Sequence, residues 1–407
     1  MGRPAGRGVR HALRHGAARI DAATPASRDR AVDALRALAV LGVVLGHWLV
    51  TALVSDGGGT LRAESPLRHM PWLAPVSWAF QTLAVFFLVG GYVATRGRAA
   101  ARERGTPYRR WLAVRLGRLF RPVLALLALW AVTAGLLLLT GAELMTVHTL
   151  VKLALSPLWF LLVFAALTAA TPLLARLHPL WPLAVVLHVD LLRFGLGGPA
   201  WPGWINLAAG WAVPWTLGAA WARGELKHRR AGWTLLAGGT AATAALVAWA
   251  GYPASMVGVP GAAVSNLDPP TLAAVTFGLA QCGLALLLRE RLRRALRRPV
   301  AWAAVALVNL FAMTVFLWHQ TAMMTVTATG LLAGRLPGLH TLPDGPHWVA
   351  ARLVWLPVFT PALAVCWAAF RTCERGGGRR RPRTRVVRTH LPRDRATTKG
   401  TEGVRHV

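Results

Sequence analysis

Residues Asp33 to Trp48 read DALRALAVLGVVLGHW and open a hydrophobic run long enough to cross a bilayer. The run nevertheless carries Arg36 and His47. Eleven residues at about 100° each return a helix to within about 20° of its starting face, so both side chains share one stripe, about 16 Å apart along the axis. Asp33 falls near the same stripe. Because a membrane helix tolerates such groups only where they face protein or water, the stripe predicts a functional interior.

A purely structural interpretation of this stripe stays open. Asp33 would cap the helix, Arg36 would lie at the lipid headgroups, and His47 would form a hydrogen bond between helices. The presence of all three groups on one stripe favours the functional interpretation.

The composition is that of a helical membrane protein. The chain has 407 residues, of which 55% are hydrophobic and 15% charged, and a mean hydropathy of +0.45. Its formal charge of +31 lies in the tails and in alternate loops, which is typical of membrane topology and argues against nucleic acid as a partner. Cys282, Cys366 and Cys373 have neither the spacing of a metal site nor that of a disulfide framework.

The hydrophobic runs predict an all-α polytopic membrane protein of about ten transmembrane helices. Arg and Lys alternate between loops and are rich in both tails, which fits an even number of spans with both termini cytoplasmic in the plasma membrane. The expected spans are 34–55, 76–96, 120–140, 157–176, 179–197, 203–222, 232–251, 271–289, 300–328 and 349–370.

Three regions follow from this pattern. We expect a disordered basic cytoplasmic tail over residues 1–30, one transmembrane domain over residues 31–370, and a second disordered basic tail over residues 371–407. The last tail contains RRRPRTR, a run that suits the anionic surface of the bilayer.

This topology places polar groups from several helices at a similar depth, in the middle and outer parts of the membrane. Convergence at one depth is more informative than any single group, because a lone intramembrane His is usually a packed hydrogen-bonding residue. The converging residues are His47, Gln81, Trp159, Asn206, Asn309, His319 and Gln320.

A second feature lies on the cytoplasmic side. Arg115, Arg118 and Arg121 are spaced three apart, so they share one helix side just before the third span. Guanidinium groups suit phosphate oxygens, although the general bias of cytoplasmic loops toward Arg is an alternative explanation.

Together these features suggest a donor with a phosphate-bearing head at the cytoplasmic face and a reactive end near His47. Acyl-coenzyme A has this anatomy, and its pantetheine arm is about as long as the axial separation of Arg36 and His47. His47 would then act as general base on an acceptor hydroxyl. This mechanism requires a continuous passage from the arginines to the imidazole; geometry alone leaves proton-coupled transport as an alternative.

At these residues the chain resembles membrane acyltransferase family 3. The resemblance rests on VDALRALAVLGVVLGHW, in which Arg and His are separated by ten residues, and on FFLVGGY (residues 86–92). It continues in the same order through RLGRLFRP (115–122), LWFL (158–161) and FLWHQ (316–320), and covers roughly residues 30–370.

The resemblance implies transfer of an acyl group, often acetyl, from a cytoplasmic donor to a hydroxyl of a sugar, glycan or natural product. The essential His and Arg of the family map onto His47 and Arg36. Many relatives carry a Ser where this chain has Gly90, and some carry an appended extracellular hydrolase-like domain that this chain lacks.

We therefore expect acyl-CoA, with acetyl-CoA favoured, as co-substrate, and neither a bound cofactor nor a metal. The sequence specifies neither the acceptor nor the oligomeric state. The expected site residues are His47, Arg36 and Asp33 for catalysis, Arg115, Arg118, Arg121, Phe87 and Gly91 for the donor, and Trp159, His319 and Gln320 for the acceptor.

Two other functions remain as alternatives. A transporter or flippase would use Arg36, His47 and His319 as a polar pathway, although such proteins often show inverted repeats and broken helices. A non-catalytic scaffold would act through the basic tail beyond Arg371.

Overall fold

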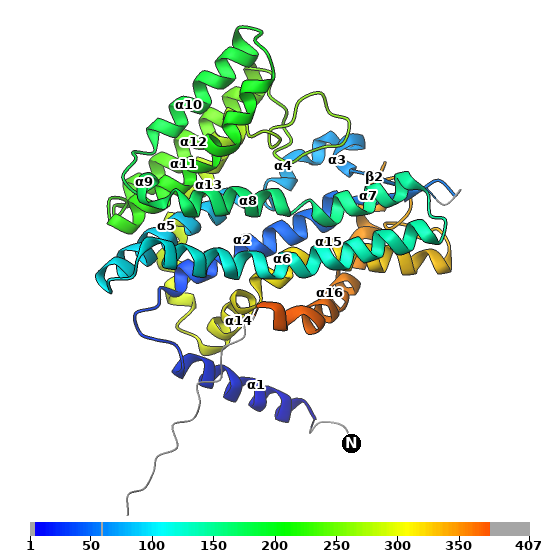
Figure 1. The fold of residues 1–407 in the computed structure, drawn as a ribbon, viewed down its shortest axis with the longest axis horizontal. Helices are drawn as coiled ribbons and strands as arrows, with labels where there is room; N and C mark the ends of the chain where they lie inside the picture. Colours follow the sequence, from blue (N-terminus) through cyan, green and yellow to red (C-terminus); the bar gives the residue numbers. More distant parts are fainter. Residues whose placement is uncertain (1–4, 58–59, 375–407) are drawn as a thin grey trace, which may run out of the picture.

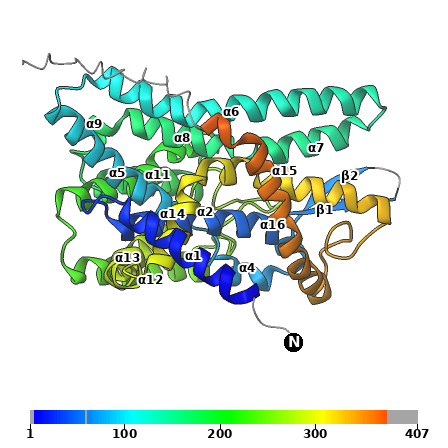
Figure 2. The same cartoon turned by 90° about the horizontal axis from the view of Figure 1, so that it is seen from below.

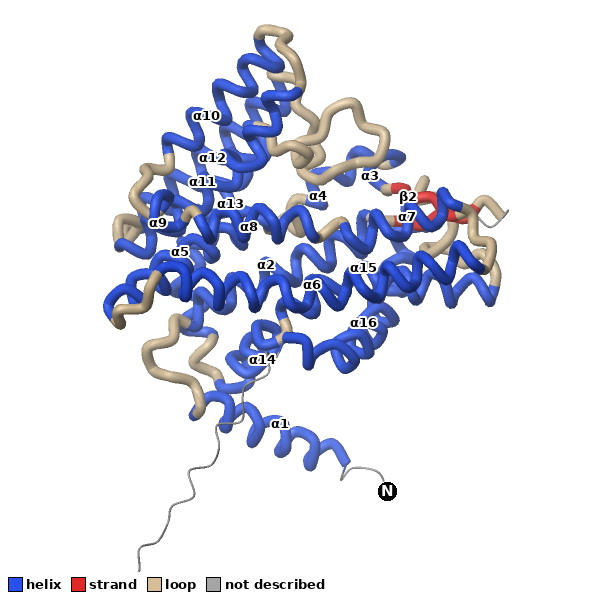
Figure 3. The backbone as a smooth tube through the Cα atoms, in the orientation of Figure 1, coloured by secondary structure: helices blue, strands red, loops and turns tan. Residues whose placement is uncertain are grey.

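The computed structural model describes residues 5–57 and 60–374, and nearly all of its elements are helices (Figures 1 and 3). The only strands among the described residues form one antiparallel hairpin, so the predicted all-α class is confirmed. The elements in chain order are α1 (Ala5–Ala22), α2 (Arg30–Val50), β1 (Ala52–Ser55), β2 (Leu61–Glu64), α3 (Pro66–His69), η1 (Pro71–Leu73), α4 (Ala74–Ser77), α5 (Leu83–Glu103), α6 (Tyr108–Leu139), α7 (Leu144–Leu155), α8 (Leu158–Ala169), α9 (Thr171–Leu174), α10 (Leu180–Asp190), η2 (Leu191–Gly195), η3 (Trp201–Trp204), α11 (Ile205–Arg223), α12 (Arg229–Trp249), α13 (Leu272–Ala295), α14 (Pro299–Leu310), α15 (Ala312–Gly330), η4 (Leu331–Ala333) and α16 (Pro346–Glu374).

Helix α2 begins earlier than the sequence pattern predicts. Asp29 has an extended backbone, and its carboxylate accepts a hydrogen bond of 3.2 Å from the amide of Ala31, which makes it the N-cap. Asp33 lies in the first turn of the helix, so the interpretation of Asp33 as the cap is wrong. The helix ends at Val50, where the extended backbone of Thr51 leads into β1.

The middle of the molecule is occupied by α2, which contacts α5, α13, α14, α15 and α16 (Figure 1). In that view α2, α6 and α15 run lengthwise, whereas α10 to α13 rise steeply away from them. Figure 2 shows α12 and α13 nearly end-on, which confirms that this group is strongly inclined to α6. Side chains along α2 therefore meet several different neighbours over its length.

Six described helices are long and apolar enough to cross a membrane, and α14 with α15 gives up to seven, because this pair is bent by 70° at a short break. The segment Leu144–Ala169 counts as one of the six. The predicted count of about ten spans is not confirmed: α5, α10 and α11, which correspond to three predicted spans, are not among these helices. Helix α10 has only 11 residues.

Helices α5 and α11 pack closely because glycines face the opposite backbone. A Cβ atom on Gly91 would lie 2.0 Å from the carbonyl oxygen of Trp215, and a Cβ on Gly218 would lie 2.0 Å from that of Leu88. Small residues of this kind are typical of close helix packing in membranes. The contact fixes the position of α5, which supplies part of the site.

The two predicted tails differ from expectation where the structure describes them. Residues Ala5–Ala22, which the sequence places in a disordered tail, form helix α1, which packs against α14 (Figure 1). Ala and Arg, which dominate this segment, are strong helix formers. Helix α16 continues to Glu374, past the predicted start of the second tail at residue 371, and the rest of that tail lies outside the described residues.

Candidate active site

Two cavities lie along α2, one near each end. The first, here called the arginine cavity, has a volume of about 760 Å³. Its wall contains five arginines, which come from the α1–α2 connection, α2, α6 and α16: Arg28, Arg36, Arg115, Arg118 and Arg371. The second, the histidine cavity, has a volume of about 270 Å³ and is lined by His47.

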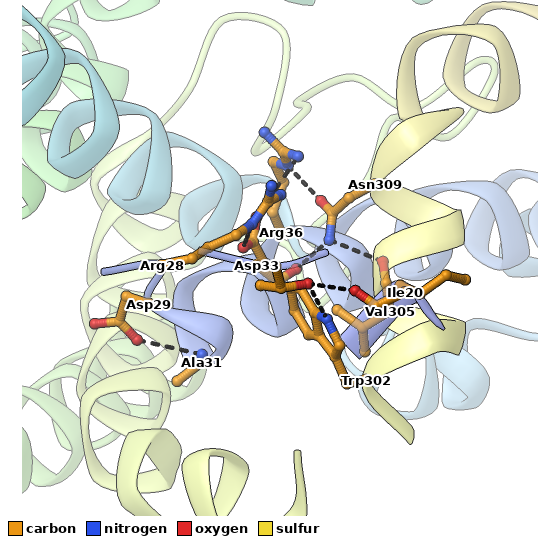
Figure 4. Close-up of polar contacts among 10 residues, drawn as sticks. Ile20, Arg28, Asp29, Ala31, Asp33, Arg36, Trp302, Val305 and Asn309 are labelled. Atoms are coloured by element: carbon orange, nitrogen blue, oxygen red, sulfur yellow. Dashed lines mark hydrogen bonds and ion pairs between the residues drawn. The ribbon is translucent and has the colours of Figure 1, made fainter. Parts of the chain in front are cut away.

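Arg36 is held in a polar network at the edge of the arginine cavity (Figure 4). Its Nε donates to the side-chain oxygen of Asn309, and its Nη2 lies 3.8 Å from the carboxylate of Asp33. The Asn309 amide donates in turn to the backbone carbonyls of Asp33 at 2.7 Å and Val305 at 3.0 Å. Asp33 also pairs with Arg28 at 2.6 Å. The network orients Arg36 from two directions.

This arrangement leaves the cavity strongly cationic. Arg28 and Arg36 share the carboxylate of Asp33. Among the side chains that the structure describes, which do not include that of Glu374, no carboxylate lies at ion-pair distance from Arg115, Arg118 or Arg371. Such a site attracts a ligand with several negative charges, and guanidinium groups match the geometry of phosphate oxygens.

Helix α1 forms part of the wall of the arginine cavity, through Ile20, Ala23 and Thr24 in and just after its last turn. The Trp302 indole on α14 donates a hydrogen bond of 2.7 Å to the Thr24 hydroxyl. The guanidinium of Arg30 lies 5.0 Å from the ring centre of Trp302, within cation–π range. The N-terminal segment therefore completes a site whose other walls come from the helical bundle.

In the histidine cavity, the orientation of His47 is fixed by its own helix. Its Nδ1 lies 2.9 Å from the carbonyl oxygen of Val43. A carbonyl can only accept a hydrogen bond, so Nδ1 carries the proton, and in the neutral ring Nε2 keeps a lone pair. This is the protonation state that a general base requires.

His319 contacts the ring of His47 but does not line the histidine cavity. The two ring centres are 4.9 Å apart, and the side chain of His319 is completely buried. Its Nδ1 donates to the carbonyl of Phe316 at 2.6 Å, and its own carbonyl accepts a hydrogen bond of 2.9 Å from the Trp48 indole. This burial favours a supporting position for His319 over direct contact with an acceptor, the role expected from the sequence.

Other polar groups line the histidine cavity around His47. Gln320 is 1% exposed, and its side-chain oxygen has no hydrogen-bond partner. Trp159 offers a flat apolar ring, as sugar-binding sites do, and Gln81 and Glu64 contribute further oxygens. The carboxylate of Glu64 lies 3.6 Å from Arg68, so its charge is partly compensated. The rest of the wall is mainly apolar, so the cavity combines a few hydrogen-bonding groups with an apolar lining.

The passage that the sequence predicts from Arg36 to His47 is not open. Arg36 lines one cavity and His47 the other, and no described residue lines both. The bend between α14 and α15 contributes to this separation. It turns Asn309 toward the arginine cavity, while Gln320 lines the histidine cavity.

Six of the eleven predicted site residues line a cavity, three in each of the two cavities. Arg36, Arg115 and Arg118 line the arginine cavity, and His47, Trp159 and Gln320 line the histidine cavity. Asp33 pairs with arginines at the far end of α2 from His47, so it has no direct contact with the imidazole.

Three predicted donor residues lie outside both cavities. Arg121 is exposed on α6. Phe87 is fully buried and stacks on Trp211 at 4.8 Å, and Gly91 packs against α11. Their neighbours Phe86 and Gly90 line the arginine cavity instead, because one residue along a helix turns a side chain by about 100°.

Four residues of the sites were not assigned by the sequence. Arg28 and Arg371 fell in segments that the sequence placed in tails. The sequence grouped Asn309 with His47 at one depth of the membrane, whereas the structure places Asn309 at the arginine cavity. The signal that singled it out was a polar residue within a predicted span. Arg352 was not singled out: it is 1% exposed and donates to the carbonyls of Trp48 and Thr51, both at 2.6 Å, which caps α2 next to His47. An Arg within a predicted span is the signal that could have identified it.

No group of three His, Cys, Asp or Glu side chains in the described part of the chain could hold a metal ion. The five arginines of the arginine cavity are the groups that could hold an anionic cofactor or co-substrate.

Comparison with known proteins identifies the family. The model of acyltransferase family 3, described as an acyltransferase domain, matches residues 29–371, which is most of the chain. Neither a curated protein nor a solved structure matched the chain. The match begins at the N-cap of α2 and ends within α16, so it includes the histidine cavity and most of the arginine cavity. It leaves out α1 and the residues before Asp29 that complete the arginine cavity. The chain is therefore a member of acyltransferase family 3, a membrane protein and an acyl-transferring enzyme.

Proposed function

We propose that the enzyme transfers an acyl group, acetyl in the simplest case, from acyl-CoA to a hydroxyl group of a carbohydrate or natural product, with His47 as general base. The observation that carries this proposal is the hydrogen bond from His47 Nδ1 to the Val43 carbonyl, which leaves Nε2 available at the wall of a cavity. Family membership favours this function over the transporter and the scaffold.

The donor would bind by its phosphates in the arginine cavity. Arg115, Arg118 and Arg371 have no carboxylate partner among the side chains that the structure describes, and Arg36 is already oriented by Asn309. Charge-assisted hydrogen bonds from such groups are about twice as strong as neutral ones. On the expected topology this cavity opens to the cytoplasm, where acyl-CoA is available, and both termini of the chain lie on that side of the plasma membrane.

The acceptor would lie in the histidine cavity, against Trp159 and within reach of the unpaired oxygen of Gln320. His47 Nε2 takes the proton of the acceptor hydroxyl as its oxygen attacks the thioester carbonyl. The C–O bond forms, the C–S bond breaks, and the coenzyme A thiolate leaves and receives that proton from the imidazolium. Proton and charge therefore balance within one turnover.

The direct test is the rate of acyl transfer from labelled acetyl-CoA to a polyhydroxylated acceptor by the purified protein. His47→Gln removes the base and should lower kcat by about 100- to 10,000-fold. His188→Gln is the matched control, because His188 is exposed on α10 and lines neither cavity. Undiminished transfer by His47→Gln would remove His47 from the mechanism.

A further inference from the structure

A layer of aromatic rings fills the space between the two cavities. Phe86 on α5 lines the arginine cavity, and Phe160 on α8 and Phe316 on α15 line the histidine cavity. The ring centre of Phe160 lies 5.0 Å from that of Phe86 and 5.2 Å from that of Phe316. We call these three side chains the aromatic septum.

The septum is thin. On α5, Leu83 lines the histidine cavity and Phe86 the arginine cavity, only three residues later. On α15, Met313 lines the arginine cavity and Phe316 the histidine cavity, with the same spacing. Three residues correspond to a rise of about 4.5 Å, so the cavities approach to within about one helical turn.

The rings of the septum differ in how tightly they are held. Phe160 is 2% exposed and Phe316 is 4% exposed, and both belong to the packed core. Phe86 is only partly buried and faces the larger cavity, so its ring has open volume beside it. Phe86 is therefore the ring that can turn, whereas Phe160 and Phe316 form a fixed rim.

We propose that the aromatic septum is the passage through which the acyl thioester reaches His47, and that its rim limits the size of the acyl group transferred. This inference rests on the proposed function. Phe86 turns into the arginine cavity when the donor binds, and the short acyl end enters the space that this ring leaves beside the fixed rings of Phe160 and Phe316. With Phe86 in the position seen in the structure, the septum is closed and the two cavities are separate.

The size limit follows from the close packing of the rim. A rigid apolar site discriminates by about 10- to 200-fold for each methylene group that it must accommodate or exclude. Replacing Phe160 by Ala removes a ring from the rim and should open the passage to longer chains. Phe164 provides the matched control: it lies one turn further along α8 and lines the arginine cavity, but not the histidine cavity.

The first experiment compares kcat/KM for acetyl-CoA and butyryl-CoA with the full-length protein. Phe160→Ala should raise the butyryl-to-acetyl ratio by about tenfold or more, while Phe164→Ala leaves that ratio within about twofold of the unchanged protein even if its overall activity falls. Thermal unfolding checks that each variant is folded. Phe86→Leu is the second variant, with the same expected direction, in case Phe160→Ala does not fold.

A second measurement does not depend on the identity of the donor. In a protein whose natural cysteines are replaced by Ser, His47→Cys is labelled with a membrane-impermeant thiol reagent in vesicles of both orientations. Arg118→Cys reports which side the arginine cavity faces. From that side, Phe160→Ala should accelerate labelling at position 47 by about tenfold, and Phe164→Ala should not.

The outcomes separate the two proposals. Failure of the unchanged protein to use any acyl-CoA would overturn the proposed donor, while the labelling experiment still decides the septum. Folded Phe160→Ala and Phe86→Leu proteins with an unchanged acyl ratio and an unchanged labelling rate would overturn the septum.

Discussion

The two cavities along α2 differ in volume and in charge. The arginine cavity is large and strongly cationic, and its wall includes a helix outside the family match. The histidine cavity is about a third of that volume and is lined mainly by uncharged side chains around one oriented imidazole. On the proposed function, affinity for the donor and the chemical step would arise at opposite ends of one helix. Substitutions at the two ends should therefore have separable effects.

The largest expected effect concerns α16, which carries the buried Arg352 toward one end and Arg371, at the arginine cavity, toward the other. Arg352 donates to the carbonyls of Trp48, Thr51 and Gly338. Arg352→Leu would leave these three carbonyls without that donor, at about 1–3 kcal/mol each, so we expect a loss of about 3–9 kcal/mol of stability in detergent. Thermal unfolding measures it.

Arg371→Leu is the matched control for that prediction. Arg371 is exposed at the other end of the same helix, and it lines the arginine cavity. Its replacement should leave stability within about 0.5 kcal/mol and weaken donor binding instead. Equal losses of stability in both variants would contradict the assignment of different roles to the two ends of α16.

A smaller effect, on binding alone, is expected for Arg118→Gln. Removing one charge-assisted hydrogen bond to phosphate is worth about 1.5–3 kcal/mol, so the KM for acyl-CoA should rise by about tenfold or more with little change in kcat. Arg121→Gln, three residues along α6 but outside the cavity, should change KM by less than about twofold. Steady-state kinetics with varied acyl-CoA distinguishes these outcomes, and equal effects at both positions would argue against the cavity as the donor site.

The orientation of Arg36 gives a further prediction. Asn309→Ala removes the side-chain acceptor of Arg36 Nε without removing the charge. The loss of one hydrogen bond of about 0.5–1.5 kcal/mol should raise the KM for acyl-CoA by about two- to tenfold. Asn206→Ala is a useful comparison, because Asn206 is bonded to Asp190 and lines neither cavity. A larger KM change in Asn206→Ala would contradict the role given to Asn309.

The smallest expected effect concerns the wall formed by α1. Trp302→Phe removes the hydrogen bond to Thr24, worth about 1 kcal/mol, and should loosen the N-terminal segment without unfolding the bundle. Trypsin cleavage near Arg28 and Arg30 should then accelerate about fivefold, and bound acyl-CoA should slow it. Cleavage as slow as in the unchanged protein would show that Thr24 does not hold α1 in place.

The sequence predicted which residues line the cavities better than it predicted which residues lie beside them. The stripe on α2 identified Arg36 and His47, and polar residues in apolar segments identified Trp159 and Gln320. The role of His319 stays a prediction, and so do the chemical roles of the other site residues.

Three features could not be predicted, for physical reasons. No Pro or Gly near Leu310 marks the 70° bend between α14 and α15 in the sequence. This bend separates Asn309 from the histidine cavity. The choice between Phe86 and Phe87 depends on a rotation of about 100°, which a hydrophobic motif does not specify. The wall formed by α1 depends on a tertiary contact with Trp302, which is far away in the sequence.

The central claim is that donor binding and base catalysis reside in different cavities, and titration of the His47→Gln protein with acyl-CoA tests it most directly. We expect a dissociation constant within about twofold of that of the unchanged protein, because His47 does not line the arginine cavity, together with loss of acyl transfer. Loss of acyl-CoA binding in this folded variant would contradict it.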